Sequence, residues 1–338
     1  MSGFGYTVLG FGSHPNRGPN ANLFNLASVK TIHETNSNDG VGINFNAGAA
    51  DSGWMTGVQV IGTDMYVSNR GNNNDFDSTH PFITKIAISS TGDGAIVRQN
   101  ATGLGLNSMD GFALNSDGSK IILADFHGAE IRSGTFAEDG SDATLLNITL
   151  NGSALAAGGG VRFARWNNDG SKYYFGYGLG TGSSRIKQYE TATNYIVASG
   201  DTAGTSQDLA IEAASDLIFN SDGTKMYISR HTGYIYEYSL STPYDISTET
   251  LVTTFNLTSF FTSNASSSNS PWRPSNSDSR TPWLAGLSWN DDGSKLYVIT
   301  LWGTTIQSKV SGTVNPSTVT GEGGSRTNTM PIIEFRVQ

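Results

Sequence analysis

The chain has 338 residues, a formal net charge of -9 and no cysteine, and only 14% of its residues are charged. Without cysteine there is neither a disulfide framework nor a thiolate metal site, and the shortage of clustered Lys and Arg excludes the phosphate attraction on which nucleic-acid binding depends. No stretch reaches the roughly 18 apolar residues of a membrane span, and no secretory signal opens the chain. We therefore expect a soluble protein without membrane insertion.

The first segment, residues 1–26, is rich in Gly and Asn and has little amphipathic pattern. Such a segment cannot bury enough apolar surface to form a core of its own, so we expect an extended N-terminal arm. Its apolar side chains are the expected anchors on a neighbouring protein: Phe4, Tyr6, Leu9, Phe11 and Phe24.

Residues 27–338 are predicted to form one all-β domain built from a repeated unit. The phrase Asn-x-Asp-Gly-Ser/Thr-Lys recurs between apolar runs at 115–120, 167–172, 220–225 and 290–295. Asp-Gly between β-rich runs indicates a tight hairpin, because Gly accepts a positive φ. The hairpin glycines are 52, 53 and 70 residues apart, and a period near 50 in an all-β chain is typical of β-propeller blades.

Aligned on the hairpin, each unit predicts four antiparallel strands with alternating apolar positions. A degenerate first blade, with Gly62-Thr63 at its turn, comprises 55–61, 64–69, 82–89 and 94–100. The second comprises 111–115, 120–126, 129–136 and 143–150. The third comprises 162–167, 172–178, 184–190 and 194–200, and the fourth 216–220, 225–230, 234–240 and 250–258.

The fifth blade supplies only three strands, at 286–290, 295–302 and 332–337, before the sequence stops. Residues 27–36 have the pattern of an outer strand, and we expect them to complete this blade, which would close a five-bladed ring and leave no exposed edge at the seam. A ring of six or more blades would need further strands. Only 258–282 could hide them, and its sequence indicates a loop.

The predicted ring has one plain face, formed by the Asp-Gly hairpins, and one face that carries the long loops 70–81, 258–282 and 302–330. Long loops on a rigid scaffold are where binding usually resides, and Arg and aromatic side chains are the preferred anchors. The candidate ligand-binding residues on this face are Arg70, Asp125, His127, Arg230, His231, Trp272, Arg273, Trp283 and Trp302.

Other interpretations of these residues are plainer. An Asp in a turn normally bonds nearby backbone amides, so the repeated Asp-Gly phrase indicates turn chemistry. His127 and His231 fall at corresponding places in two blades, but two imidazoles without a third ligand do not predict a zinc site. No catalytic constellation, metal or cofactor motif is evident, because Gly-rich 180–183 and 103–105 lack the structural context of a nucleophile elbow or a nucleotide loop. We therefore expect a protein that is not an enzyme.

The hairpin phrase resembles that of the lactonase-like and TolB-like bacterial propellers, which implies a fold and no particular activity. The pairing of NSDGTKMYIS at 220–229 with YIYEYSLSTPYDIST at 234–248 resembles repeats in propeller proteins of bacteriophages from marine and aquatic bacteria, and the opening MSGFGYTVLGFGS is similar to those of small phage structural proteins. This resemblance implies a non-enzymatic virion structural protein in the tail, a fibre or another exposed appendage.

By the same resemblance, the arm is expected to bind other virion proteins within a homo-oligomeric or larger assembly, and the propeller to contact a host surface glycan or receptor. The alternative is a bacterial propeller enzyme or glycan-binding lectin located outside the cytoplasm, extracellular or periplasmic.

Overall fold

The computed structural model describes residues 25–33, 55–69, 82–87, 96–100, 106, 108–138, 146–177, 183–257, 284–291, 293, 295–300, 304–306 and 327–336. Their regular structure is β-strand throughout, apart from one 3-10 turn, η1 (Ile246–Thr248). No helix in this part of the chain is long and apolar enough to cross a membrane.

The strands form five antiparallel sheets, which we number in chain order. The first sheet consists of β2 (Met55–Ile61), β3 (Asp64–Asn69), β4 (Phe82–Ala87) and β5 (Ile96–Asn100). The second consists of β6 (Met109–Leu114), β7 (Lys120–Asp125), β8 (Glu130–Glu138) and β9 (Leu146–Ala156). The third consists of β10 (Val161–Trp166), β11 (Lys172–Tyr177), β12 (Ser183–Glu190) and β13 (Thr202–Glu212).

The fourth sheet consists of β14 (Ala214–Phe219), β15 (Lys225–Arg230), β16 (Tyr234–Leu240) and β17 (Glu249–Asn256). The fifth has the order β1-β21-β19-β18 and is made of β18 (Leu284–Trp289), β19 (Lys295–Thr300), β21 (Thr327–Arg336) and β1 (Asn25–His33), while the short β20 (Thr304–Ile306) also pairs with β21.

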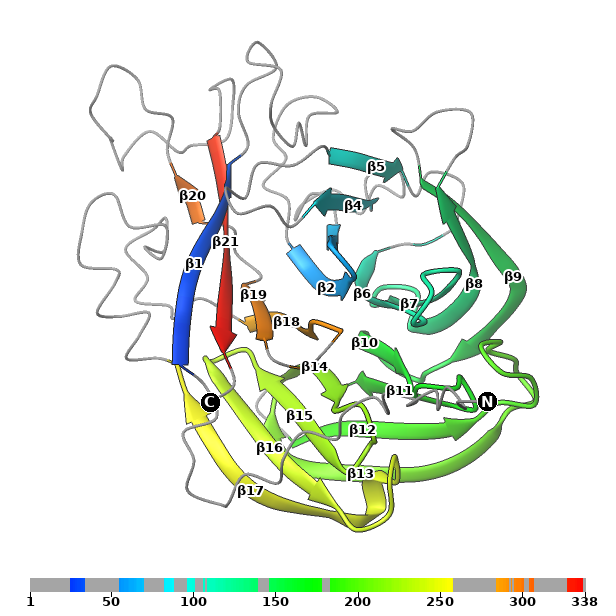
Figure 1. The fold of residues 1–338 in the computed structure, drawn as a ribbon. Coiled ribbons are helices and arrows are strands. Elements are labelled where there is room, and N and C mark those ends of the chain that lie inside the picture. Colours follow the sequence, from blue (N-terminus) through cyan, green and yellow to red (C-terminus); the bar gives the residue numbers. More distant parts are fainter. Residues whose placement is uncertain are drawn as a thin grey trace, which may run out of the picture.

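The sheets stand around a common centre (Figure 1). Their first strands, β2, β6, β10, β14 and β18, contact one another in that order, and β18 contacts β2. The arrangement of antiparallel, mostly four-stranded sheets is consistent with a β-propeller. The core lies between neighbouring sheets; for example, Phe163 of the third sheet packs with Leu217 and Ile228 of the fourth. Burying one such side chain contributes about 1.5–3 kcal/mol.

The outer strand of the fifth sheet comes from the other end of the chain. β1 pairs with β21 from Asn25 opposite Arg336 to His33 opposite Thr329, so segments about 300 residues apart in the sequence lie side by side (Figure 1). β1 begins two residues before the predicted start of the domain. The predicted anchors of the arm, Phe4, Tyr6, Leu9, Phe11 and Phe24, lie outside the described residues.

The Asp-Gly phrases form the hairpins between first and second strands, and their aspartates bond the turn itself. Asp117 accepts the amide hydrogen of Ser119 at 2.8 Å, and Asp222 accepts that of Thr224 at 3.0 Å. The hairpin glycines have positive φ, as in Gly223 at 71°. These bonds hold the pKa of Asp117 below its usual value, because the carboxylate accepts hydrogen bonds from both Ser119 groups. The turn interpretation of the phrase is thus confirmed in these hairpins.

One predicted strand was wrong. Residues 194–200, expected as the outer strand of the third blade, form a turn, and the outer strand β13 begins later, at Thr202. In this turn Tyr195 has a φ of 62°, its amide donates to the carbonyl of Gly170 at 2.9 Å, and its ring covers that glycine. The apolar pattern of the segment therefore reflects packing on the hairpin rather than a strand.

The same turn occurs in the fourth sheet. Tyr244 has a φ of 58° and donates its amide hydrogen to the carbonyl of Gly223 at 2.9 Å, with its ring over that glycine. In the second sheet the outer strand is displaced in the same direction, since β9 spans Leu146–Ala156 rather than 143–150.

Candidate binding site at the centre of the ring

A buried ion pair lies among the first strands of the sheets. Arg165 on β10 and Asp216 on β14 are 5% and 1% exposed, and Nε of Arg165 donates to Oδ1 of Asp216 at 2.9 Å while Nη2 donates to Oδ2. Nη1 donates to Oε1 of Gln59 on β2 at 3.0 Å. Nη2 also donates to the carbonyl oxygens of Val58 on β2 and Leu287 on β18, at 3.3 and 3.1 Å. One guanidinium therefore joins four of the five first strands.

The carboxylate of this pair is also saturated by main-chain donors. Asp216 accepts the amide hydrogens of Leu217 and Leu287, each at 2.8 Å. Burial raises the pKa of Asp216, and the Arg165 guanidinium and the two amides oppose that effect. Because these partners are other parts of the protein, the ion pair acts as a structural link between the sheets.

A second group of polar side chains lies nearer the start of the first strands, on the side away from the hairpins. Arg162 precedes Arg165 by three residues, about 10 Å along the strand. Its Nη1 lies 3.2 Å from Oδ2 of the buried Asp110 on β6, and its guanidinium carbon lies 4.4 Å from the centre of the Phe126 ring. We call this group, with His127 and His231, the polar mouth.

The two histidines of the polar mouth differ in environment. The ring of His127 is exposed and meets Phe126 edge-on, with 5.0 Å between ring centres. His231 follows β15 and is buried; burial, together with the positive charge of Arg162, lowers the pKa of its imidazole to about 3. His231 is therefore neutral at pH 7, and its main-chain carbonyl accepts the amide hydrogen of Leu284 of the fifth sheet at 3.2 Å.

The polar mouth offers a cation stacked on an aromatic ring beside an exposed imidazole, which suits recognition of a polar or anionic group better than bond-breaking chemistry. Its charged pair is balanced internally, because Arg162 already contacts Asp110. Within the described ranges, no group of three or more His, Cys, Asp or Glu side chains could hold a metal ion.

Other predicted site residues occupy different environments. Asp125 is fully buried and accepts the amide hydrogens of Ser108 and Gly128, at 3.0 and 2.8 Å, so its carboxylate holds the turn after β7. The guanidinium carbon of Arg230 lies 6.0 Å from the centre of the Tyr234 ring on β16. The remaining candidates lie outside the described residues: Arg70, Trp272, Arg273, Trp283 and Trp302.

Sequence reasoning missed Asp110, Phe126, Arg162 and Arg165. The two arginines, three positions apart, stand among apolar residues in a strand expected at the centre of the ring, and buried charges are rare unless paired. Two arginines in such a strand were the sequence signal for a buried ion pair, although they do not identify the acidic residues that pair with them.

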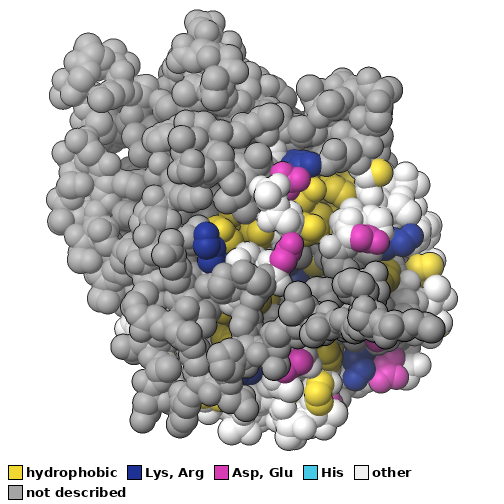
Figure 2. All heavy atoms as spheres, viewed as in Figure 1, with side chains coloured by type: hydrophobic (Ala, Val, Ile, Leu, Met, Phe, Trp, Pro, Cys, Tyr) yellow, Lys and Arg dark blue, Asp and Glu magenta, His cyan; other side chains and the backbone are white. Residues whose placement is uncertain are grey.

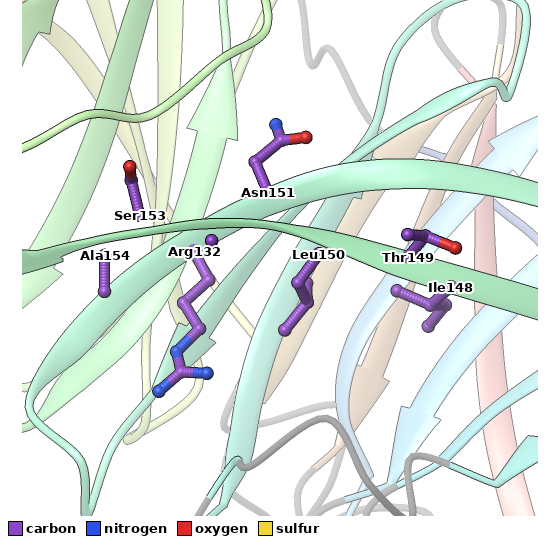
Figure 3. Close-up of a pocket in the computed structure, with 8 residues that line it drawn as sticks. Arg132, Ile148, Thr149, Leu150, Asn151, Ser153 and Ala154 are labelled. Carbon is purple, nitrogen blue, oxygen red and sulfur yellow. The ribbon is translucent and has the colours of Figure 1, made fainter.

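A separate pocket of ≈ 380 Å³ lies at the outer edge of the second sheet. It forms where the ladder between β8 and β9 is irregular: Arg132 pairs with Ala154, but Gly134 pairs with Leu150. Figure 3 shows Arg132, Leu150 and Ala154 projecting to one side of β9 and Asn151 and Ser153 to the other. Nε of Arg132 donates to Glu130 at 2.6 Å, so its charge is engaged locally and we assign no ligand to this pocket.

In the view of Figure 2, basic, acidic and hydrophobic side chains of the described residues are interspersed. Charges of one sign do not gather in one region of this part of the surface.

No protein-family model and no curated protein matches the chain. Among solved structures, it is similar to Sqt1 from Chaetomium thermophilum, with 8% identity, a TM-score of 0.37 and coverage of 75% of this chain and 56% of that one. It is also similar to the β-propeller domain of Cps50 (Swd1) from Myceliophteria thermophila, with 7% identity, a TM-score of 0.36 and coverage of 70% and 59%.

A third similar structure is a putative 6-phosphogluconolactonase from Bacteroides uniformis, with 14% identity, a TM-score of 0.37 and coverage of 81% of this chain and 72% of that one. The chain thus spans somewhat more than half the length of the first two structures. With these scores, none of the three supports a conclusion about function.

Proposed function

We propose that the chain is a five-bladed β-propeller and that it serves as a non-enzymatic structural protein of a bacteriophage virion, in the tail, a fibre or another exposed appendage. Two features support five blades: the first strands of the five sheets contact one another in a cycle, and β1 pairs with β21 in the fifth sheet. Closure of the ring by β1 would leave that sheet without an exposed edge at the seam.

The Arg165–Asp216 pair is the observation that supports a role other than catalysis. The strongest charges near the centre of the ring bond to each other and to main-chain groups of Val58 and Leu287. A general base or nucleophile must be free to reach a substrate, whereas these groups are committed to holding the sheets together. A scaffold that displays a surface is the function that such a centre suits best.

The proposed role in a virion rests on the sequence resemblance at 220–229 and 234–248. The polar mouth is the proposed contact surface. On this proposal, the face with the long loops contacts a host surface glycan, a receptor or an adjacent virion subunit, with the exposed His127 and the largely buried Arg162 as polar contacts. The arm binds other virion proteins through Phe4, Tyr6, Leu9, Phe11 and Phe24.

The deciding experiment compares particles that assemble in the presence of the full chain or of a chain that lacks residues 1–24. The full chain is expected in purified particles, and the truncated chain is expected to be soluble, folded by circular dichroism and absent from them. Absence of the full chain from particles would overturn the virion role, and equal incorporation of both would overturn the anchoring arm. Binding of a glycan by the isolated chain without incorporation would favour the lectin alternative.

A further inference from the structure

The outer strand of the second sheet, β9, contains Asn151 followed by Gly152, and this is the only Asn-Gly pair in the sequence. Asparagine is one of the thermally labile residues. Its side-chain amide carbon is open to attack by the next main-chain nitrogen, and glycine, without a Cβ, hinders that approach least. Whether the pair reacts in the folded protein depends on how firmly the surrounding structure holds it.

The ladder between β8 and β9 is interrupted at this pair. Between Leu150 and Ala154, β9 has three residues where β8 has one, Ser133. None of residues 151–153 has a partner in the strand register. Extra residues in such a bulge lie outside the regular ladder, so the main chain there is less restrained than in the paired parts of the strand.

The pair is also accessible. Gly152 and Ser153 are exposed, and no heavy atom lies within 4 Å of the position that a Cβ would occupy at Gly152. The half-buried Asn151 stands on the side of β9 opposite to Leu150 (Figure 3), and its Nδ2 donates to Ser133 Oγ at 3.2 Å. Water therefore reaches the segment, and one side-chain hydrogen bond holds the asparagine amide.

The Asp-Gly pairs of the hairpins are held much more firmly, although their sequence is similar. Gly118 donates its amide hydrogen to the carbonyl oxygen of Asn115 at 3.0 Å, and Asp117 accepts the amide hydrogen of Ser119 at 2.8 Å. The hairpins of the third and fourth sheets make the same two bonds. In these turns the glycine nitrogen and the carboxyl group are both engaged, which opposes their reaction with each other.

We propose that Asn151 is a deamidation site of the folded protein. The main-chain nitrogen of Gly152 loses its proton and attacks Cγ of Asn151. The new N–C bond closes a succinimide ring, the bond from Cγ to Nδ2 breaks, and the side-chain nitrogen leaves as ammonia. Water then opens the ring at one of its two carbonyl carbons, which gives aspartate or isoaspartate. Water is the only co-reactant, and no oxidation or reduction takes place.

The reaction changes a hydrogen bond where the second and third sheets meet. Ser133 Oγ accepts hydrogen bonds from Asn151 Nδ2 and from the buried amide of Val197, in the connection to β13, at 2.8 Å. A carboxylate accepts hydrogen bonds and donates none, so the hydroxyl of Ser133 becomes the donor toward position 151. Isoaspartate also lengthens the main chain of β9 by one carbon. Each reacted chain carries one negative charge more than the formal -9.

Incubation of the purified full-length chain in mildly alkaline buffer tests the site. Ion exchange should resolve a more acidic species that accumulates with time, and peptide mapping by mass spectrometry should place the change at Asn151, as a mixture of aspartate and isoaspartate. Asn147 is the internal control, because it lies on the same strand, pairs with Ala137 in the regular ladder and precedes Ile148. Equal reaction at Asn147, or no reaction at Asn151, would overturn the proposal.

The variant Gly152→Ala tests the attacking nitrogen. A methyl group at position 152 meets no other part of the protein, so this variant should keep the wild-type thermal unfolding curve while its methyl group slows closure of the ring. Accumulation of the acidic species should then slow clearly, and it should quicken with rising pH in the wild-type chain because the nitrogen must lose its proton. An unchanged rate in Gly152→Ala would show that the succinimide route is wrong.

The same digest tests the argument from geometry. Isoaspartate at Asp117, Asp169 and Asp222 should form later than at position 151 in the folded chain, because the hairpin bonds hold these residues. Unfolding in urea should remove this difference between the hairpins and Asn151. Isoaspartate that forms first in the hairpins of the folded chain, or a site at Asn151 that reacts only after unfolding, would contradict the proposal. None of these outcomes depends on the virion role.

Discussion

Arg165 and Asp216 come from two different sheets, and both bond to the same residue of a third. Nη2 of Arg165 donates to the carbonyl of Leu287, and the carboxylate of Asp216 accepts the amide hydrogen of Leu287. The ion pair and this one residue link β10, β14 and β18. These bonds also connect β10 with β18, which are separated by β14.

Removing one member of this pair should be costly. Asp216→Asn leaves the guanidinium of Arg165 buried without its counter-ion, and we expect a loss of about 3–5 kcal/mol in the free energy of unfolding, measured by urea denaturation. The double variant Arg165→Met with Asp216→Leu should recover part of this loss, because neither charge is then buried. A double variant that is less stable than Asp216→Asn would contradict this assignment.

The tyrosine that covers the hairpin glycine provides a second prediction. Gly223→Ala places a methyl group in the left-handed region, at a φ of 71°, and also against the ring of Tyr244. Gly118→Ala has the same strain, with a φ of 72°, but its methyl group would meet only Ile61 Cδ1 at 3.7 Å. We expect Gly118→Ala to cost about 1–2 kcal/mol and Gly223→Ala clearly more by thermal denaturation. Equal losses would show that the ring moves aside freely.

The hairpins were predictable because a local phrase determines them: Asp bonds the amide two residues on, and only Gly suits the turn's φ. The outer strand of the third sheet was not predictable. The ring of Tyr195 packs on Gly170, and this contact joins distant parts of the chain. The pairing of Arg162 with Asp110, and of Arg165 with Asp216, was equally hidden. Residues of different sheets meet only in the folded protein, so local periodicity carries no information about these pairings.

Burial of His231 makes stability depend on pH. Its folded-state pKa of about 3 lies below the ordinary value of 6.5, so between these values the unfolded chain binds a proton that the folded chain excludes. Stability contributed by the neutral imidazole is full above about pH 6.5 and falls as the pH decreases toward 3, by up to about 1.4 kcal/mol per pH unit. Urea denaturation between pH 4.5 and 7 should show a shallower slope for His231→Gln.

The pH range in which His231 affects stability differs from that of the aspartates in the turns. Asp117, Asp169 and Asp222 have pKa values lowered below 3.8 by the hydrogen bonds of their turns, so their contribution to stability is lost at lower pH. An unchanged slope between pH 4.5 and 6.5 in His231→Gln would place the titrating group elsewhere.

Arg162 should also set the acidity of His231, because its positive charge opposes protonation of the imidazole. In Arg162→Gln we expect the pKa of His231 to rise above about 3, while burial keeps it below 6.5, as measured by NMR titration of the imidazole carbon-bound protons. Loss of the Arg162 contact to Asp110 acts in the same direction, because it leaves a nearby carboxylate uncompensated. Arg230→Gln is the matched control: Arg230 precedes His231 in the chain, but its guanidinium carbon lies 6.0 Å from the centre of the Tyr234 ring. A pKa of His231 that responds to Arg230 and not to Arg162 would remove the electrostatic link on which the polar mouth is defined.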